Sequence, residues 1–69
     1  MELRAEMVAN VWQVLVGTGQ QVDAGTEIVI LESMKMEIPI VAPVAGTAVV
    51  HVEENQVVQD GDLIATIET

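Results

Sequence analysis

The chain has 69 residues, no cysteine, and 11 acidic against two basic side chains, which gives a formal net charge of −9. This length allows one small domain, residues 1–69, and the absence of cysteine excludes disulfide bridges, thiolate metal sites and thiol nucleophiles. Nucleic acid and anionic membranes are excluded as partners because binding phosphate groups requires clustered Lys and Arg. No apolar run approaches the ~20 residues of a membrane span, and the acidic start is unlike a secretory signal. We therefore expect a soluble cytoplasmic domain that acts as a carrier or substrate rather than as an enzyme.

Valine and isoleucine dominate the apolar residues, with 13 and six copies, and such β-branched side chains favour strands. In chain order, the apolar runs between turn residues predict strands at 11–16, 27–32, 36–42, 47–52 and 63–68. No stretch of helical length has a 3.6-residue period, so we expect no helix. Alternation along the runs predicts an inward-facing set: Val14, Val16, Val22, Ile28, Ile30, Ile38, Ile40, Val50, Val52, Val58, Ile64 and Ile67.

The chain also repeats itself, because residues 8–33 align with residues 44–69 after a shift of 36 positions. Any two Val-rich segments align in part, but the shared Val-x-x-Gly spacing at 22–25 and 58–61 is harder to obtain from composition alone. Two units are too few for a solenoid and suit one domain made of two interlocked halves. We predict an all-β fold: a flattened β-barrel or sandwich (barrel-sandwich hybrid) of two small antiparallel sheets with a pseudo-two-fold internal repeat. The chain ends should then lie together, opposite Lys35.

Only Met34 and Lys35 separate the strand-like runs 27–33 and 36–42. Two-residue hairpin loops favour Asn-Gly or Gly-X because their residues need positive φ, so Met-Lys is a poor choice. A non-glycine residue in that conformation costs about 1–3 kcal/mol, and such strain gathers at functional sites. Lys35 is also the only lysine, and Met34 and Met36 place soft apolar side chains on both sides of it, as partner surfaces do. The competing interpretation is an ordinary surface turn with both methionines in the core.

The hexapeptide at 32–37, Glu-Ser-Met-Lys-Met-Glu, resembles the attachment site of biotinyl domains, whose hallmark is Met-Lys-Met with a biotinylated lysine. The two Val-x-x-Gly elements and the segment Ala-Pro-Val-Ala-Gly at 42–46 are similar to further elements of the biotinyl/lipoyl attachment family, so the resemblance covers nearly the whole chain. In size the chain is most like the small stand-alone bacterial biotin/lipoyl attachment proteins. It departs from the family at Ser33, where many members have Ala, and at Asn10, which falls on Gly46 in the repeat. The chain also has no room for the protruding loop of some carrier subunits.

The resemblance implies a non-catalytic biotin carboxyl carrier with covalent biotin on Lys35. A biotin-protein ligase would attach the biotin, with Met34 and Met36 as flanking recognition residues and Glu32, Ser33 and Glu37 as further ligase contacts. The modified monomer would then present biotin as a swinging arm to biotin carboxylase and carboxyltransferase partners in trans. Because a lysine side chain in water is mostly protonated at neutral pH, the ligase must supply both the base and the activated acyl group.

Two other functions stay open on the sequence alone. A lipoyl carrier, or one that accepts both cofactors, shares this lysine position, although typical lipoyl domains have Asp-Lys-Ala at the tip. The other is a β interaction module without a cofactor. The lone His51 leaves no metal site and no nucleophile–base pair, and Trp12 is expected to be a core residue or a half-buried ring. The acidic surface suits solvation and could also steer a basic partner.

Overall fold

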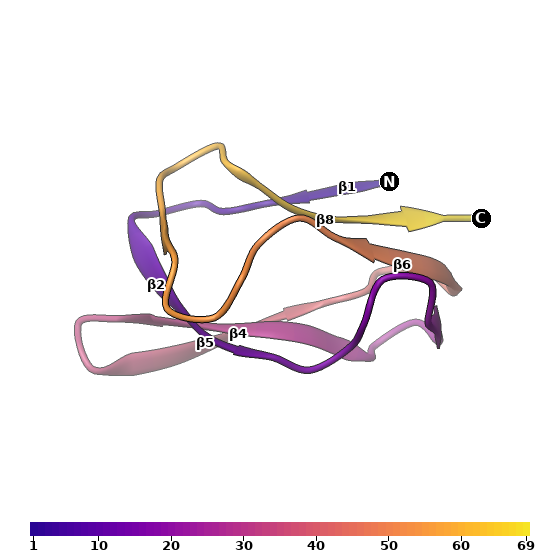
Figure 1. Ribbon diagram of the computed structural model, residues 1–69, viewed down its shortest axis with the longest axis horizontal. Helices are drawn as coiled ribbons and strands as arrows, with labels where there is room; N and C mark the ends of the chain where they lie inside the picture. The colour runs from indigo at the N-terminus through magenta and orange to yellow at the C-terminus, as the bar shows by residue number, and fades with distance from the viewer.

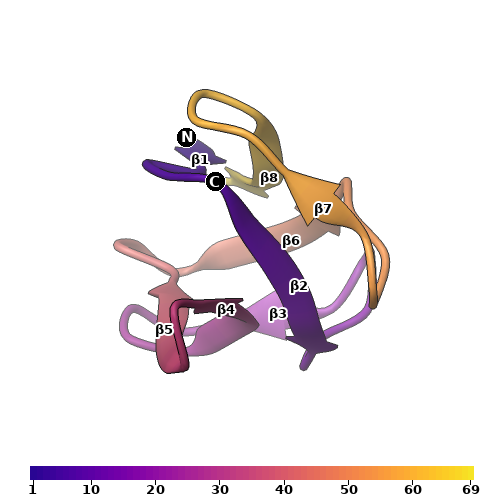
Figure 2. The same cartoon turned by 90° about the vertical axis from the view of Figure 1, so that its left-hand side faces the viewer.

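The computed structural model describes residues 1–69 and consists of eight strands without a helix. Figures 1 and 2 show the strands stacked in two layers, which form two four-stranded antiparallel sheets with the orders β1-β8-β6-β3 and β5-β4-β2-β7. This confirms the predicted fold class. The structure therefore contains no helix that could serve as a membrane span. The strands are β1 (Glu2–Arg4), β2 (Ala9–Val14), β3 (Gln21–Val22), β4 (Glu27–Ser33), β5 (Met36–Val41), β6 (Gly46–Val50), β7 (Val57–Val58) and β8 (Leu63–Glu68).

All five predicted strands are present, as β2, β4, β5, β6 and β8; β8 has the predicted bounds, and the other four have shifted ends. The largest shift is in β2, which runs from Ala9 to Val14 where the sequence predicted 11–16. The prediction missed β1, with three residues, and β3 and β7, with two each. Strands this short contain no full period of apolar alternation, so periodicity cannot detect them.

The internal repeat is present in the three-dimensional structure. A shift of 36 residues carries β3 onto β7 and β4 onto β8, and the two sheets have matching strand orders when β5 and β2 are placed on β1 and β6. The glycines of the two Val-x-x-Gly turns, Gly25 and Gly61, have φ of 91° and 92°. Their N–H groups donate to the carbonyls of Ala42 and Ala5 over 2.7 and 2.8 Å. Each glycine thus supplies a conformation that other residues rarely adopt, at equivalent places in the two halves.

The register differs from the sequence alignment at one point. Ala9 pairs with Val58 as Gly46 pairs with Val22, so Ala9 is the counterpart of Gly46. The predicted equivalence of Asn10 with Gly46 is therefore wrong, and Asn10 does not have a positive φ. The extra residue that shifts the register is Trp12, which lies where the β2–β4 pairing slips between Val11 and Gln13.

The core contains 15 buried residues, all of them apolar. Seven of the 12 predicted inward residues are buried, and Val14, Ile38, Ile40 and Val50 are partly buried against the core. Ile30 is the wrong assignment. The β4–β5 pairing slips around Ile28, so Val29 and Leu31 point inward and Ile30 outward. The buried residues that the prediction missed are Ala5, Ala9, Val11, Val29, Leu31, Ala42, Ala48 and Ala65.

The two chain ends lie side by side, as predicted, at the end of the molecule opposite the β4–β5 hairpin (Figure 1). The Met1 ammonium donates a hydrogen bond of 2.9 Å to the Ile67 carbonyl, and the Ile67 N–H donates one of 2.8 Å to the Met1 carbonyl. The N-terminal amine is thus tied to β8, away from the hairpin tip along the long axis of the molecule (Figure 1).

Candidate cofactor attachment site

The tip of the β4–β5 hairpin consists of two residues, Met34 and Lys35, because pairing continues up to Ser33 and Met36. Their φ angles are 52° and 66°, both in the left-handed region. Positive φ at both central residues is the pattern of a type I′ turn, which normally takes Asn-Gly. The sequence-based expectation of a strained tip is therefore confirmed. The strain is located at the only lysine of the chain.

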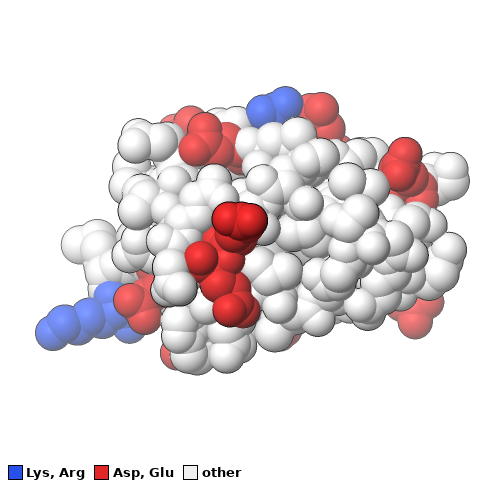
Figure 3. All heavy atoms as spheres, in the orientation of Figure 1, with Lys and Arg blue, Asp and Glu red and all other residues white.

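The side chains of the tip point away from the body of the domain. Met34 is 92% exposed and Met36 is 61% exposed, so neither methionine belongs to the core. Lys35 is exposed as well, and the ion pair found in the structure joins Arg4 to Glu2 rather than Lys35 to an acid. Figure 3 shows a basic side chain projecting from the left end of the molecule, where Figure 1 places the hairpin. The tip therefore presents a free primary amine between two exposed thioethers.

The base of the hairpin is acidic and is anchored to the rest of the domain. Glu32 and Glu37 are paired across β4 and β5, one residue pair behind the pair of Ser33 and Met36. Carboxylates directly opposite each other repel, so this arrangement does not serve stability. The Ser33 hydroxyl donates a hydrogen bond of 3.2 Å to the Val8 carbonyl, which ties the hairpin to the segment before β2.

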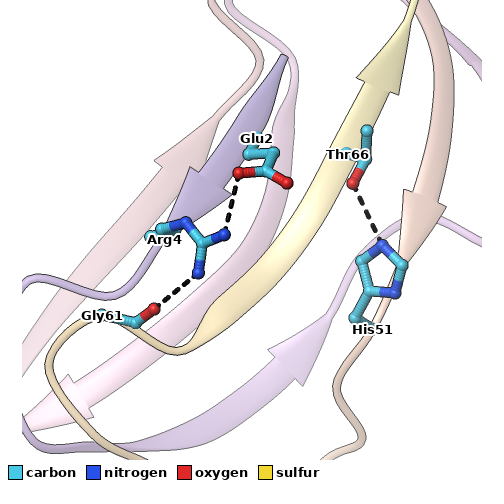
Figure 4. Close-up of polar contacts among 5 residues, drawn as sticks. All are labelled: Glu2, Arg4, His51, Gly61 and Thr66. Atoms are coloured by element: carbon cyan, nitrogen blue, oxygen red, sulfur yellow. Dashed lines mark hydrogen bonds and ion pairs between the residues drawn. The ribbon is translucent and has the colours of Figure 1, made fainter.

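The other residues singled out from the sequence lie elsewhere. His51 is hydrogen-bonded through Nε2 to the Thr66 hydroxyl over 3.1 Å, on the sheet that does not contain the hairpin (Figure 4). Trp12 is 43% exposed on β2, so the half-buried ring is the correct alternative. The structure brings residues 32–37 together and leaves His51 apart.

Sequence reasoning missed a cavity of about 340 Å³ between the edge strands β1 and β5. Leu3, Ile38 and Ile40 form part of its apolar wall, and Glu2 and Arg4 lie among its polar lining residues. No sequence signal marks this cavity, because β1 is too short for apolar alternation to detect it.

Comparisons with known proteins place this arrangement in a family. The family model described as "Biotin-requiring enzyme", for biotin/lipoyl attachment, matches residues 3–67. The chain belongs to the biotin/lipoyl attachment family. It is 52% identical over 67 residues to the biotinylated protein TB7.3 homolog of Mycobacterium leprae, covering 96% of this chain and 94% of that protein. It is 45% identical over 65 residues to the biotin/lipoyl attachment protein of Bacillus subtilis, covering 93% and 89%.

Among solved structures, a domain of the Kluyveromyces lactis urea carboxylase superimposes with a TM-score of 0.90 at 29% identity, covering 99% of this chain and 6% of that chain. The chain is thus similar to a small part of a urea carboxylase and to nearly the full length of the two relatives named above. The tip fits the cofactor class of the biotin/lipoyl family, since biotin and lipoate are carboxylic acids that form amides with an accessible primary amine, and Lys35 offers one.

Proposed function

We propose that residues 1–69 form one biotin carrier domain that a biotin-protein ligase modifies at Lys35. The observation that carries this proposal is the position of the only lysine, which lies exposed at a strained two-residue tip between two exposed methionines. The domain is not an enzyme in this proposal. It acts in the cytoplasm, where the ligase has ATP.

In the attachment step the domain contributes position. The Lys35 Nζ loses a proton to a base of the ligase, attacks the activated acyl carbon, and displaces the activating group as the amide bond forms. Strand pairing up to Ser33 and Met36 holds the backbone of Lys35 at the end of the hairpin, and the hydrogen bond from Ser33 to Val8 limits sideways motion of the hairpin. Such fixed placement lowers the entropic cost of reaction in the ligase.

In the carrier step the domain supplies a flexible attachment that lets biotin move between active sites. Bound biotin supplies the capacity to carry a carboxyl group. The lysine stem at the tip gives the cofactor a flexible connection, so that biotin carboxylase and carboxyltransferase active sites acting in trans can be visited in turn by one monomeric carrier. The K. lactis neighbour, a urea carboxylase, supports this assignment to a carboxylase system.

The flanking side chains identify the tip to the ligase. Met34 and Met36 expose most of their flexible, polarisable surface, which suits recognition by a partner. The carboxylates of Glu32 and Glu37 add negative charge at the base of the hairpin and would attract a basic ligase surface. Lipoate is the second candidate cofactor, because the B. subtilis relative is named a biotin/lipoyl attachment protein.

The test incubates the protein with a biotin-protein ligase, ATP and biotin and reads the intact mass. Wild type should gain one biotin, and Lys35→Arg, which keeps the charge and removes the attacking amine, should gain none. Met34→Asp with Met36→Ala should remain folded, take biotin more slowly and shift residual modification towards lipoate in a parallel lipoylation assay. Equal biotin incorporation by wild type and Lys35→Arg would contradict the site assignment, since the Met1 amine is the remaining primary amine.

A further inference from the structure

The outer faces of the two sheets differ in polarity, although the repeat makes their backbones equivalent. On the sheet that contains the hairpin, Ile30 lies between Pro39 on β5 and Gln13 on β2. The same place on the other sheet has Thr66 between Glu2 on β1 and Val49 on β6. An isoleucine and a proline therefore occupy positions where the second half of the fold has a threonine and a glutamate.

The next residues along the strands show the same difference. The Leu15 N–H donates to the Ile28 carbonyl as the His51 N–H donates to the Ile64 carbonyl, both over 2.9 Å, so Leu15 and His51 are counterparts. Val41 pairs with Glu27 as Arg4 pairs with Leu63, so Val41 and Arg4 are counterparts too. Leu15 is 43% exposed and Val41 is 42% exposed. We name the set Trp12, Leu15, Ile30, Pro39 and Val41 the apolar face.

The equivalent positions in the other half of the fold hold polar side chains. On the opposite sheet the counterpart residues form two polar contacts: Arg4 donates to the Glu2 carboxylate over 2.8 Å, and His51 is hydrogen-bonded to Thr66 over 3.1 Å (Figure 4). Equivalent backbone positions thus have polar side chains in one half of the fold and partly exposed apolar side chains in the other. Several exposed apolar side chains on one face of a sheet are typical of an interaction site.

Trp12 is the residue without a counterpart, because it is the extra residue at the register slip in β2. Such bulges commonly re-aim a side chain. Here the bulge carries the only aromatic residue of the chain and leaves it 43% exposed on a strand with neighbours on both sides. Tryptophan is one of the residue types enriched at the energetic centres of protein interfaces, so Trp12 provides an anchor for a partner.

The position of the apolar face near the hairpin tip favours a ligase as its partner. Ile30 and Pro39 lie three residue pairs behind Ser33 and Met36, on the order of 10 Å from the turn. A ligase must bring its reacting atoms to the lysine amine, so it must cover the tip, and a footprint of about 800 Å² per partner extends from there over the apolar face. Carboxylase active sites need to bind only the biotin at the end of the long lysine side chain, so they need not contact the surface beside the hairpin tip.

The acidic residues around the apolar face also restrict which partner can bind there. Glu27, Glu32 and Glu37 border the apolar face on β4 and β5. A partner that fits has an apolar patch rimmed by Lys and Arg. A second copy of this chain, with its net charge of −9, would be repelled. We propose that the apolar face, with Trp12 as anchor, is the docking surface for the biotin-protein ligase; this inference rests on the proposed function.

The experiment exchanges the apolar face for its polar counterparts. The variant Leu15→His, Ile30→Thr and Val41→Arg takes each residue from the equivalent place on the other sheet, so folding should be retained and is checked by circular dichroism. In steady-state biotinylation by the ligase, its KM should rise about tenfold or more while kcat stays within about twofold of wild type. The matched control, His51→Leu with Thr66→Ile, changes the other sheet and should leave both constants unchanged.

A second measurement keeps the proposal testable if the triple variant does not fold. The Lys35→Arg protein, labelled at its single tryptophan with 5-fluorotryptophan, is titrated with the ligase and observed by ¹⁹F NMR. Docking on the apolar face should shift or broaden the one resonance. An unmoved resonance during saturating binding, an unchanged KM in the folded triple variant, or self-association of wild type that the triple variant lacks would each overturn the proposal. If wild type takes no biotin at all, the proposed function itself fails, and this inference with it.

Discussion

The strained tip gives a prediction in which stability and function move in opposite directions. Met34 and Lys35 both lie in the left-handed region, at φ of 52° and 66°, which costs a non-glycine residue roughly 1–2 kcal/mol each. Replacing the pair with the Asn-Gly dipeptide that this turn prefers, by Met34→Asn and Lys35→Gly, relieves most of this cost. The glycine loses about 0.5–1 kcal/mol through its more flexible unfolded state. The net gain should be about 1–2 kcal/mol, which for a domain of this size raises Tm by roughly 5–15 °C.

The assay is thermal unfolding followed by circular dichroism, with urea denaturation as an independent measure of the free energy of unfolding. Met36→Asn is the matched control, because Met36 is also exposed but does not have a positive φ, so this change should not stabilise. The single variant Met34→Asn keeps the lysine and should be more stable than wild type yet a poorer ligase substrate. A Tm that stays equal or falls in the Asn-Gly variant would show that the turn stores no strain and would refute the reasoning.

Three further predictions concern the fold. Ile28 is fully buried, so Ile28→Ala should lower the free energy of unfolding by about 2–5 kcal/mol, and an unchanged urea midpoint would refute its place in the core. A Cβ on Gly46 would collide with the backbone of β8, whereas a Cβ on Gly17 meets nothing within 4 Å. Gly46→Ala should therefore lower the free energy of unfolding by about 1–3 kcal/mol, and Gly17→Ala should be nearly neutral. Equal Tm values for the two variants would contradict this. Arg4 donates a hydrogen bond to the Glu2 carboxylate and lowers the pKa of that carboxyl below its usual 4.5. Glu2 therefore adds stability above that pH and loses it as the pH falls through the lowered pKa. Glu2→Gln should lower Tm slightly at pH 7 and not near pH 2, as a pH series of melts would show.

The sequence was sufficient for the fold class because its signals agree. β-branched runs, turn residues between them and the repeated Val-x-x-Gly spacing all indicate the same sandwich, and Gly25 and Gly61 have nearly equal φ angles. The hairpin tip was predictable for the opposite reason, since Met34 and Lys35 violate the turn preference that their position imposes.

The side-chain orientations that the sequence did not predict result from single-residue slips in strand register. Strict alternation placed Ile30 inward, whereas the slip at Ile28 turns it outward and buries Val29 and Leu31. A one-residue slip moves each later side chain to the other face. The repeat could have revealed this error. Ile67 is the counterpart of Leu31 and was in the predicted core, so Leu31 should have been predicted to point inward as well. The register slip at Trp12 has no corresponding signal in the sequence and is seen only in the pairing of β2 with β4.

The most direct test of the central claim is the intact mass of this protein purified from its native cell, followed by peptide mapping of any adduct. If the chain is a biotin carrier modified at its hairpin tip, a single biotin adduct will map to Lys35. A biotin adduct on the N-terminal amine, a lipoyl adduct alone, or an unmodified chain in cells whose other biotinyl domains are labelled would contradict it.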